Sequence, residues 1–408
     1  MLLKLQTKMV NLPIERFCFG LLITLCVLIY SKKLSAQDFQ YHGFVAQGVI
    51  NVDGSDFVDD EGAVSPKLTE VGVNASYRLN DKLRLAGQVV YLNGGNRYAE
   101  GVRVDYALLD WTAYESTSWK ANIFLGRFKN NHWLYSSTRD IPFARPSIIL
   151  PQSVYYDGFR DIAVGSDGVA IKISHSDDEL GNFDFNLSYG SSQLSDKQGE
   201  LLLSEYAQGK AKQEDETQIS VYWQPPFSLW RFGISYLNSD FSYKANNTAD
   251  LFFDGGFSFD FYTMNFLYEG ESLEFSGEVY QSKFLTKAFY QPNYYKAPVA
   301  QGMYLQTRYN VSEELTLLAR YEMFYNDKDD KHGKMLALQS SGTIPEYFGY
   351  HKDTTVGLSY DFSSNLRLRL EYHWVQGTGR LTPVVLPNPS LNNNKNWQLY
   401  AVQLMYWF

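Results

Sequence analysis

The sequence predicts an all-β protein, a 16-stranded antiparallel transmembrane β-barrel, and three observations lead to this prediction. Apolar and polar residues alternate along many segments, as they do on strands whose two faces meet different surroundings. The connections between these segments are alternately short and long. After residue 36 no stretch approaches the roughly 18 consecutive apolar residues of a transmembrane helix, so any membrane crossing is predicted to use strands.

Composition and charge exclude several other classes of protein. The 408 residues carry a formal net charge of −9, whereas electrostatic binding of nucleic acid requires a basic excess, so no nucleic-acid partner is predicted. Hydrophobic residues make up 45% of the chain, which excludes extensive disorder. Both cysteines, Cys18 and Cys26, precede residue 37, so no disulfide framework or thiolate site is predicted in the rest of the chain.

Residues 1–36 have the composition of an export signal. Lys4, Lys8 and Arg16 form a basic region, and residues 17–30 form an apolar stretch too short to span a bilayer comfortably. Residues 34–36 follow as a predicted cleavage site. We therefore predict a cleaved signal peptide over residues 1–36 and a mature chain over residues 37–408. An uncleaved anchor or an amphipathic leader is the alternative interpretation.

Sixteen segments of the mature chain show the alternation of a strand. The segment 366–374 is an example, because leucines alternate there with Arg367, Arg369 and Glu371. Each segment has about the length that a tilted strand needs to cross hydrocarbon. The predicted strands are 39–51, 67–79, 83–92, 102–113, 119–128, 167–175, 182–191, 217–224, 229–239, 257–269, 273–284, 298–310, 315–326, 352–362, 366–375 and 397–408.

The connections between the predicted strands alternate in length. Short turns are expected at 80–82, 270–272, 311–314 and 363–365, and long connections at 53–66, 129–166, 192–216, 240–256, 285–297, 327–351 and 376–396. Such asymmetry is typical of outer-membrane barrels, which have short periplasmic turns and long external loops. No linker divides residues 37–408, so one barrel domain is predicted, with both ends on the periplasmic side.

The last predicted strand carries a pattern of its own. One face of this strand consists of Tyr400, Val402, Leu404, Tyr406 and Phe408. This face resembles the terminal signature of bacterial outer-membrane proteins, which the barrel-assembly machinery reads. The resemblance implies that the chain lies in the outer membrane, where lipid and lipopolysaccharide surround it.

A barrel of sixteen strands encloses an aqueous lumen, and the alternation places many charged residues on its inner face. These charges would be costly in a dry core but not beside water, so a channel is predicted. The wall residues are Arg84, Arg103, Asp105, Arg308, Arg320, Glu322, Arg367, Arg369 and Glu371. Basic residues outnumber acidic ones on the predicted inward faces, which indicates a weak anion preference. A β-bulge would change this count, and the change of parity between Phe261 and Tyr262 predicts one.

The connection 129–166 is the longest, and its apolar runs at 148–150 and 154–156 are not needed in a solvated loop. We expect it to pack against the lumen wall. Its candidate constriction residues are Arg139, Asp140, Arg145, Asp157, Arg160 and Asp161. They have two interpretations. They set a transverse field that filters solutes by charge, or the neighbours Arg139–Asp140 and Arg160–Asp161 form salt bridges that hold the loop.

In this pattern the chain resembles the Gram-negative outer-membrane porins, trimeric sixteen-stranded barrels whose third loop folds inward. Residues 138–146 and 150–155 resemble a loop of a porin-like branch in marine gamma-proteobacteria. They do not match the acidic constriction motif of the enterobacterial porins, so only the position of the loop is carried over. The resemblance implies a homotrimer and passive diffusion of small hydrophilic solutes, with no cofactor.

No motif in the sequence predicts catalysis or metal binding. The six histidines lack metal-ligand spacing, and no nucleophile elbow or phosphate-binding loop occurs. A substrate-specific channel for an anionic nutrient is the main alternative, because Arg308, Arg320, Arg367 and Arg369 could form an arginine ladder. A barrel enzyme or an adhesin is a more distant alternative.

Overall fold

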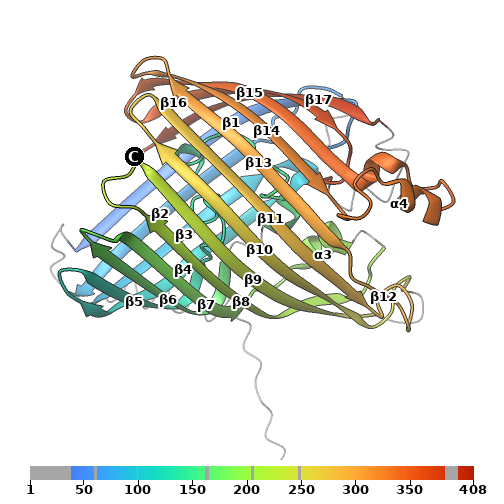
Figure 1. Ribbon diagram of the computed structural model, residues 1–408, viewed down its shortest axis with the longest axis horizontal. Coiled ribbons are helices and arrows are strands. Elements are labelled where there is room, and N and C mark those ends of the chain that lie inside the picture. Colours follow the sequence, from blue (N-terminus) through green and yellow to red (C-terminus); the bar gives the residue numbers. More distant parts are fainter. Residues whose placement is uncertain are drawn as a thin grey trace, which may run out of the picture.

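The strands of the protein form one closed antiparallel barrel (Figure 1). The computed structural model describes residues 38–58, 62–98, 100–160, 165–203, 206–246, 250–381 and 394–408. Sixteen strands pair in sequence order, and β1 closes the barrel by pairing with both β2 and β17. A two-residue strand, β12, pairs with β11 outside this barrel. The predicted fold class is thereby confirmed, whereas the predicted signal peptide and Asp161 lie outside the described residues.

The strands of the barrel run through most of the described chain. Their bounds are β1 (Phe39–Asp53), β2 (Thr69–Asn80), β3 (Leu83–Asn93), β4 (Gly101–Glu115), β5 (Trp119–Lys129), β6 (Gly165–Asp177), β7 (Gly181–Ser191), β8 (Lys210–Gln224), β9 (Trp230–Lys244), β10 (Gly255–Glu269), β11 (Leu273–Lys287), β13 (Val299–Asn310), β14 (Leu315–Tyr325), β15 (Tyr350–Ser363), β16 (Leu366–Gln376) and β17 (Asn396–Trp407); β12 is Tyr295–Lys296.

Short helices occupy the connections. They are η1 (Gly95–Arg97), η2 (Pro142–Ala144), η3 (Asp157–Phe159), α3 (Asp196–Leu203), α4 (Lys334–Gln339) and η4 (Glu346–Gly349). In Figure 1, α4 and β12 lie at one end of the barrel, the end of the long connections, and the C-terminus lies at the other. Within the described ranges, no helix has both the length and the apolar character that crossing a membrane requires.

Every predicted strand has a counterpart, but several are longer than predicted. The largest difference is at β8, which begins at Lys210 rather than at residue 217. Its first residues pair with the end of β9, from Lys210 opposite Lys244 onward. The segment 210–216 is almost entirely polar, so no alternation marks it as a strand. The hairpin therefore extends beyond the part of the barrel whose outer face is apolar.

The predicted change of parity between Phe261 and Tyr262 is wrong. Strand β10 pairs with β9 and with β11 without any register shift. Phe261 is buried inside the barrel and Tyr262 is 57% exposed outside it, so the alternation is regular and the lumen side is aromatic here. Register shifts occur elsewhere, between Gln88 and Val89 for example.

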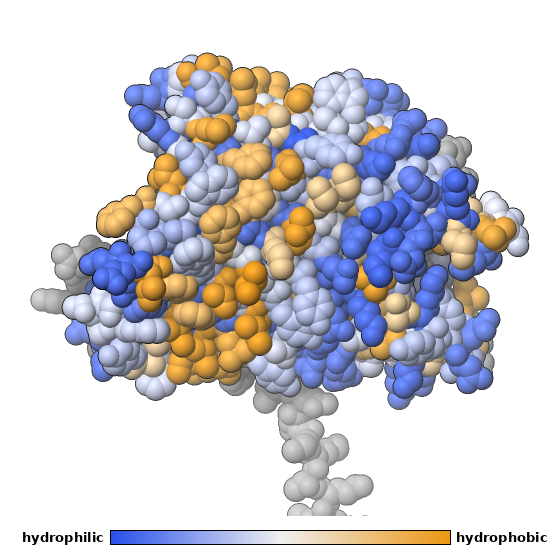
Figure 2. Space-filling view, in the orientation of Figure 1, coloured by the Kyte–Doolittle hydropathy of each residue, from blue (hydrophilic) through white to orange (hydrophobic). Residues whose placement is uncertain are grey.

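The outer face of the barrel is apolar. On β17, Tyr400, Leu404 and Tyr406 are each at least 45% exposed, whereas Leu399 and Gln403 on the opposite face are buried. Val402 is half-buried and Phe408 is exposed on the same face. Figure 2 shows hydrophobic side chains along the visible outer surface of the strands. A surface of this kind matches hydrocarbon better than water.

Candidate functional site

The connection between β5 and β6 lies inside the barrel, and its described part, residues 130–160, is called the inner loop below. Its backbone N–H groups donate hydrogen bonds to carboxylates on the inward faces of three strands. These are Ile148 to Glu371 of β16, Ser153 to Glu322 of β14 (2.6 Å) and Leu134 to Glu278 of β11 (3.1 Å). Because these strands lie far from β5, the loop must cross the lumen to reach them.

Apolar packing holds the inner loop against the wall. Ile148 and Ile149 are each 2% exposed and pack in a cluster with Trp397 and Leu399 of β17. Burying an aliphatic side chain of this size contributes roughly 1.5–3 kcal/mol. At β13 the wall approaches the loop so closely that a Cβ at Gly302 would collide with the Ser153 carbonyl. Packing alone therefore fixes much of the path of the loop.

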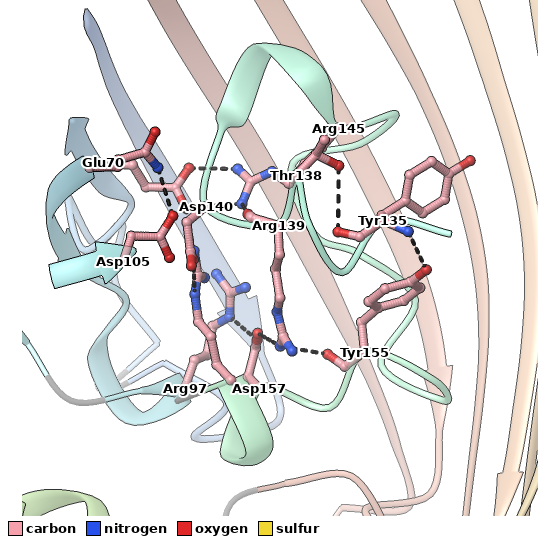
Figure 3. A network of polar contacts seen from close by, with 12 residues as sticks. Glu70, Arg97, Asp105, Tyr135, Thr138, Arg139, Asp140, Arg145, Tyr155 and Asp157 are labelled. Carbon is pink, nitrogen blue, oxygen red and sulfur yellow. Dashed lines mark hydrogen bonds and ion pairs between the residues drawn. The ribbon is translucent and has the colours of Figure 1, made fainter. Parts of the chain in front are cut away.

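Glu70 of β2 joins two arginines of the inner loop. The Arg145 guanidinium donates two hydrogen bonds to its carboxylate, Nη1 to Oε1 (3.0 Å) and Nη2 to Oε2 (2.5 Å). Arg160 Nη2 lies 3.3 Å from Glu70 Oε1 and 2.5 Å from Asp140 Oδ1. A paired, bidentate arginine of this kind is geometrically specific as well as strong. These contacts fasten two points of the loop to one strand (Figure 3).

Asp157 forms a second junction in Figure 3. It accepts hydrogen bonds from Arg139 Nη2 (3.1 Å) and from Arg97 Nε (2.7 Å). Lys129 at the end of β5 connects Asp140 (2.6 Å) with Asp105 of β4. Together the charged residues of this region form what we call the inner-loop network: Glu70, Arg97, Asp105, Lys129, Arg139, Asp140, Arg145, Asp157 and Arg160.

The inner-loop network is buried, and its two carboxylates on the inner loop, Asp140 and Asp157, remain ionised. Arg139 is 1% exposed, and Asp140 and Asp157 are no more than 5% exposed. Burial by itself would raise the pKa of Asp140, but Arg160 and Lys129 hold that pKa well below its usual range. Burial likewise opposes the effect of Arg97 and Arg139, which lower the pKa of Asp157. The network is a set of fixed, mutually compensating charges.

The predicted pair Arg139–Asp140 is wrong, whereas the predicted pair Arg160–Asp161 includes a residue outside the described ranges. Arg139 pairs with Asp157 rather than with its neighbour Asp140, and Asp140 pairs with Arg160. The turns at η2 and η3 bring residues about 20 positions apart in sequence side by side, which no local spacing reveals. The geometry supports the interpretation in which these charges hold the loop, because they are buried against protein rather than facing water.

The nine predicted wall residues all occupy inward-facing positions, but they have different surroundings. Arg320, Glu322, Arg369 and Glu371 are buried against the inner loop; Arg369 Nη1, for example, donates to the Pro142 carbonyl (2.9 Å). Arg84, Arg308 and Arg367 form ion pairs nearer the short turns, and the Arg84 side chain is 53% exposed. Asp105 belongs to the inner-loop network, and Arg103 lies opposite Val90 of β3.

One charged residue of the site and one cluster of polar residues were not predicted. Arg97 lies on η1, where no periodic pattern exists to place it. Glu322, His351 and Asp353 bring possible metal-ligand atoms within 4.8 Å of one another, although their spacing in sequence shows no motif. Each carboxylate already has a cationic neighbour: Arg320 Nε lies 3.8 Å from Glu322 Oε1, and His373 Nδ1 lies 2.7 Å from Asp353 Oδ2. The register of β14 and β15 alone brings these groups together.

On the side of β6 to β9, the inner loop leaves a polar cavity of about 260 Å³. Lys172, Asp184 and Arg231 line it from the wall, and Asn131 and Ser137 line it from the loop. Unlike the residues of the inner-loop network, Asp184 is exposed and Lys172 is half-buried. This cavity is a place where a hydrated solute can meet charges of both signs.

Comparison with solved structures agrees with this architecture. OmpT of Vibrio cholerae has a TM-score of 0.57 at 14% identity, covering 92% of this chain and 100% of that one. The trimer form of in-vitro folded Vibrio cholerae OmpT has a TM-score of 0.56 at 15% identity, with 91% and 99% covered. An anion-selective porin from Comamonas acidovorans has a TM-score of 0.56 at 12% identity, again with 91% and 99% covered.

The chain has a porin-type barrel fold. No protein-family model matches the sequence, and no curated protein is similar to it in sequence. The likeness to these solved structures therefore concerns the fold alone. In this chain the sixteen-stranded barrel encloses the inner loop.

Proposed function

We propose that the protein is an outer-membrane porin, a passive channel through which small hydrophilic solutes diffuse. The observation that carries this proposal is the contrast between an apolar outer face and a charged inner face, around a lumen that the inner loop fills only in part. Charges beside water cost little, and the inward charges that the inner loop buries are compensated by paired partners. No cofactor is required, because the solute moves down its own gradient.

In this proposal the inner loop is the constriction and the inner-loop network holds it in place. Arg139, Asp140, Arg145, Asp157 and Arg160 would act by fixing the loop rather than by touching the solute, since they are at most 5% exposed. Asp161 is assigned the same role as their neighbour in sequence. The solute would pass through the polar cavity, where Lys172 and Asp184 face it.

We further propose a weak anion preference. Basic residues outnumber acidic ones on the inward faces of the strands, and Arg84 and Lys172 are among those not enclosed by the loop. The Comamonas acidovorans structure with the same fold is described as an anion-selective porin. A substrate-specific channel for an anionic nutrient is the second candidate, favoured by an aromatic cavity between the inner loop and strands β9 to β11.

The setting of the channel is part of the proposal. A homotrimer is supported by the trimer form of Vibrio cholerae OmpT, which shares the fold. The apolar outer face suits outer-membrane lipid and lipopolysaccharide, and the exposed aromatic face of β17 suits recognition by the barrel-assembly machinery. Export through the signal peptide at 1–36, and the branch of porin-like proteins of marine gamma-proteobacteria, stay predictions.

Single-channel recording of the refolded protein in a planar bilayer with a tenfold KCl gradient tests the proposal. We expect stable ohmic steps, in groups of three if the protein is a trimer, and a reversal potential with the sign of anion preference. A heat-modifiable shift on a gel establishes separately that the barrel is folded. A folded barrel without conductance would overturn the porin assignment.

A further inference from the structure

A second cavity, of about 630 Å³, lies inside the barrel next to the inner loop, and we call it the aromatic chamber. It lies toward the long connections, where β9 ends and β10 begins. Its wall carries Phe241 of β9, Phe257, Phe259 and Phe261 of β10, Phe284 of β11 and Phe324 of β14. The cavity beside β6 to β9, in contrast, is lined with charged side chains.

The phenylalanines stand at positions where a water-filled barrel carries polar side chains. Three successive inward positions of β10 are Phe257, Phe259 and Phe261. Keeping such surface next to water is unfavourable by the hydrophobic effect, in proportion to the apolar area exposed. Concave, mostly apolar cavities of about 300–1,000 Å³ are the usual form of small-molecule sites. The chamber has the size and the lining of a binding site for one small ring-containing molecule.

The rings of the chamber are already ordered by one another. The Phe259 ring stacks on Phe284 with 4.6 Å between centroids, and Phe159 of the inner loop meets Phe259 edge-to-face at 5.0 Å. Phe257 and Phe289 meet at 4.6 Å. Offset and edge-to-face pairs of this kind are favourable arrangements that a further aromatic ring can extend. The lining is therefore preformed, and binding need not order it.

One cation lines this aromatic surface. Arg380 is 7% exposed, and its guanidinium carbon lies 3.5 Å from the centroid of Phe324 and 4.9 Å from that of Tyr156. Its Nη2 donates to the Ser153 carbonyl (3.0 Å) and to the Tyr280 hydroxyl, whereas Nε has no acceptor. Among the described residues, no carboxylate oxygen lies within 4.0 Å of it, in contrast to the paired arginines of the inner-loop network.

Glu322 acts on Arg380 through space, but no described carboxylate contacts the guanidinium. A buried cation without a contacting carboxylate is costly, and cation–π contacts compensate only part of that cost. A carboxylate brought by a ligand would supply the missing charge and a bidentate acceptor for the guanidinium. The apolar rings around Arg380 would hold the rest of the same ligand. A neutral apolar molecule satisfies only the rings, and a small inorganic anion satisfies only the arginine.

We propose that the aromatic chamber binds aromatic carboxylates, with the ring of the ligand among the phenylalanines of β10 and its carboxylate on Arg380. The inference rests on the proposed channel function and refines it, because it gives the channel a binding step for one class of anion. A solute of this class would be concentrated in the chamber before it passes the inner loop.

The test is isothermal titration of the folded, full-length protein in detergent with benzoate as the probe. Acetate supplies the charge without the ring, and benzyl alcohol supplies the ring without the charge. We expect saturable binding of benzoate that is at least about tenfold tighter than that of either control compound. Equal binding of benzoate and acetate, or of benzoate and benzyl alcohol, would overturn the proposal.

Two variants locate the site. Arg380→Gln keeps a hydrogen-bonding side chain but removes the charge, and Phe257→Ser removes one ring; each is expected to weaken benzoate binding by about tenfold or more. Arg84→Gln, at an exposed lumen arginine outside the chamber, is the matched control and should bind as the wild type does. If Arg380→Gln does not fold, Phe257→Ser alone decides the result. Unchanged binding in the folded variants would exclude the chamber.

The titration is independent of conductance, so the two proposals fail separately. A protein that conducts KCl but does not bind benzoate would remain a porin without the proposed site. A folded barrel that binds benzoate in the chamber but does not conduct would retain the site and lose the channel.

Discussion

Glu70 shows how one residue can determine the position of a whole segment. Its carboxylate accepts hydrogen bonds from Arg145 and Arg160, and it is 1% exposed. A buried carboxylate between two guanidinium groups is worth little compared with an apolar core, but removing one partner leaves the others uncompensated. The energetic importance of Glu70 therefore appears when it is replaced rather than in the intact protein.

We predict that Glu70→Gln lowers the free energy of unfolding by about 3 kcal/mol or more, because it leaves Arg145 buried without its counter-charge and removes one of the two carboxylates that Arg160 contacts. The midpoint of urea unfolding measures this. Glu274→Gln is the matched control, since Glu274 pairs with Arg308 where both side chains are 21% exposed, and its effect should stay within about 1 kcal/mol. Equal effects of the two substitutions would contradict the prediction.

The lowered pKa of Asp157 predicts how the stability of the protein depends on pH. Burial opposes but does not overcome Arg97 and Arg139, so the pKa of Asp157 is lower in the folded protein than in the unfolded chain. Its contribution to stability is fully present above the unfolded pKa, about 4, and is lost as pH falls through the lower folded pKa. The stability difference between wild type and Asp157→Asn should thus be constant from pH 8 to about 4 and shrink below it. Unfolding midpoints at several pH values measure this difference, and a difference that disappears near pH 6 would contradict the argument.

At the scale of elements, the inner loop depends on glycine at one strand position. A Cβ on Gly302 of β13 would meet the Ser153 carbonyl of the loop and the Tyr280 ring. The backbone carbonyl cannot rotate away as the end of a side chain can. The close approach of loop to wall therefore requires glycine at residue 302.

We predict that Gly302→Ala destabilises the protein by about 1–3 kcal/mol and alters single-channel conductance, because the loop must shift. Gly87→Ala on β3 is the control, because the nearest atom to its added Cβ would lie at an ordinary 3.5 Å. Both variants are compared by urea unfolding and bilayer recording. If Gly302→Ala leaves the unfolding midpoint and the conductance unaltered, the loop accommodates the added methyl group without cost and the prediction is wrong.

The strands could be predicted because alternation reports directly on the two faces of a barrel, but the inner loop could not be placed in detail. All sixteen strands were found, with errors where the outer ends are almost entirely polar, as at the start of β8. The charged residues of the loop were identified by type and position in sequence. Their partners were not, because Arg139 meets Asp157 only through the turns of the loop. The chamber was missed for a related reason: Phe259 and Phe261 face the lumen, where polar residues were expected.

At the scale of the whole molecule, the barrel has three regions of different chemistry: its outer face, the contacts that hold the inner loop, and the open part of the lumen. Apolar side chains face outward, paired charges hold the inner loop, and the remaining lumen divides into a polar cavity and the aromatic chamber. Charge selectivity should depend on the residues that face the polar cavity rather than on the buried network. Lys172 and Asp184 are suitable for a test because they face the same cavity with opposite charge.

We predict that Lys172→Glu lowers the permeability ratio of chloride to potassium by about twofold or more, and that Asp184→Lys raises it. Lys328→Glu, in the connection after β14, is the control and should leave the ratio unchanged. Reversal potentials in a KCl gradient give the ratio. If all three substitutions shift it alike, the polar cavity is not the path of the ions.

The cluster around Ile148 and Ile149 has a consequence for how the chain is assembled. It includes Ile50 of β1 and Leu399 of β17, the two strands whose pairing closes the sheet. The loop thus supports the seam of the barrel from within, and the final pairing buries the loop as it forms. Until the loop is seated, the first and last strands keep free edges that can pair with another chain. The inner loop, which narrows the lumen, is therefore also needed for correct pairing of β1 with β17 during biogenesis.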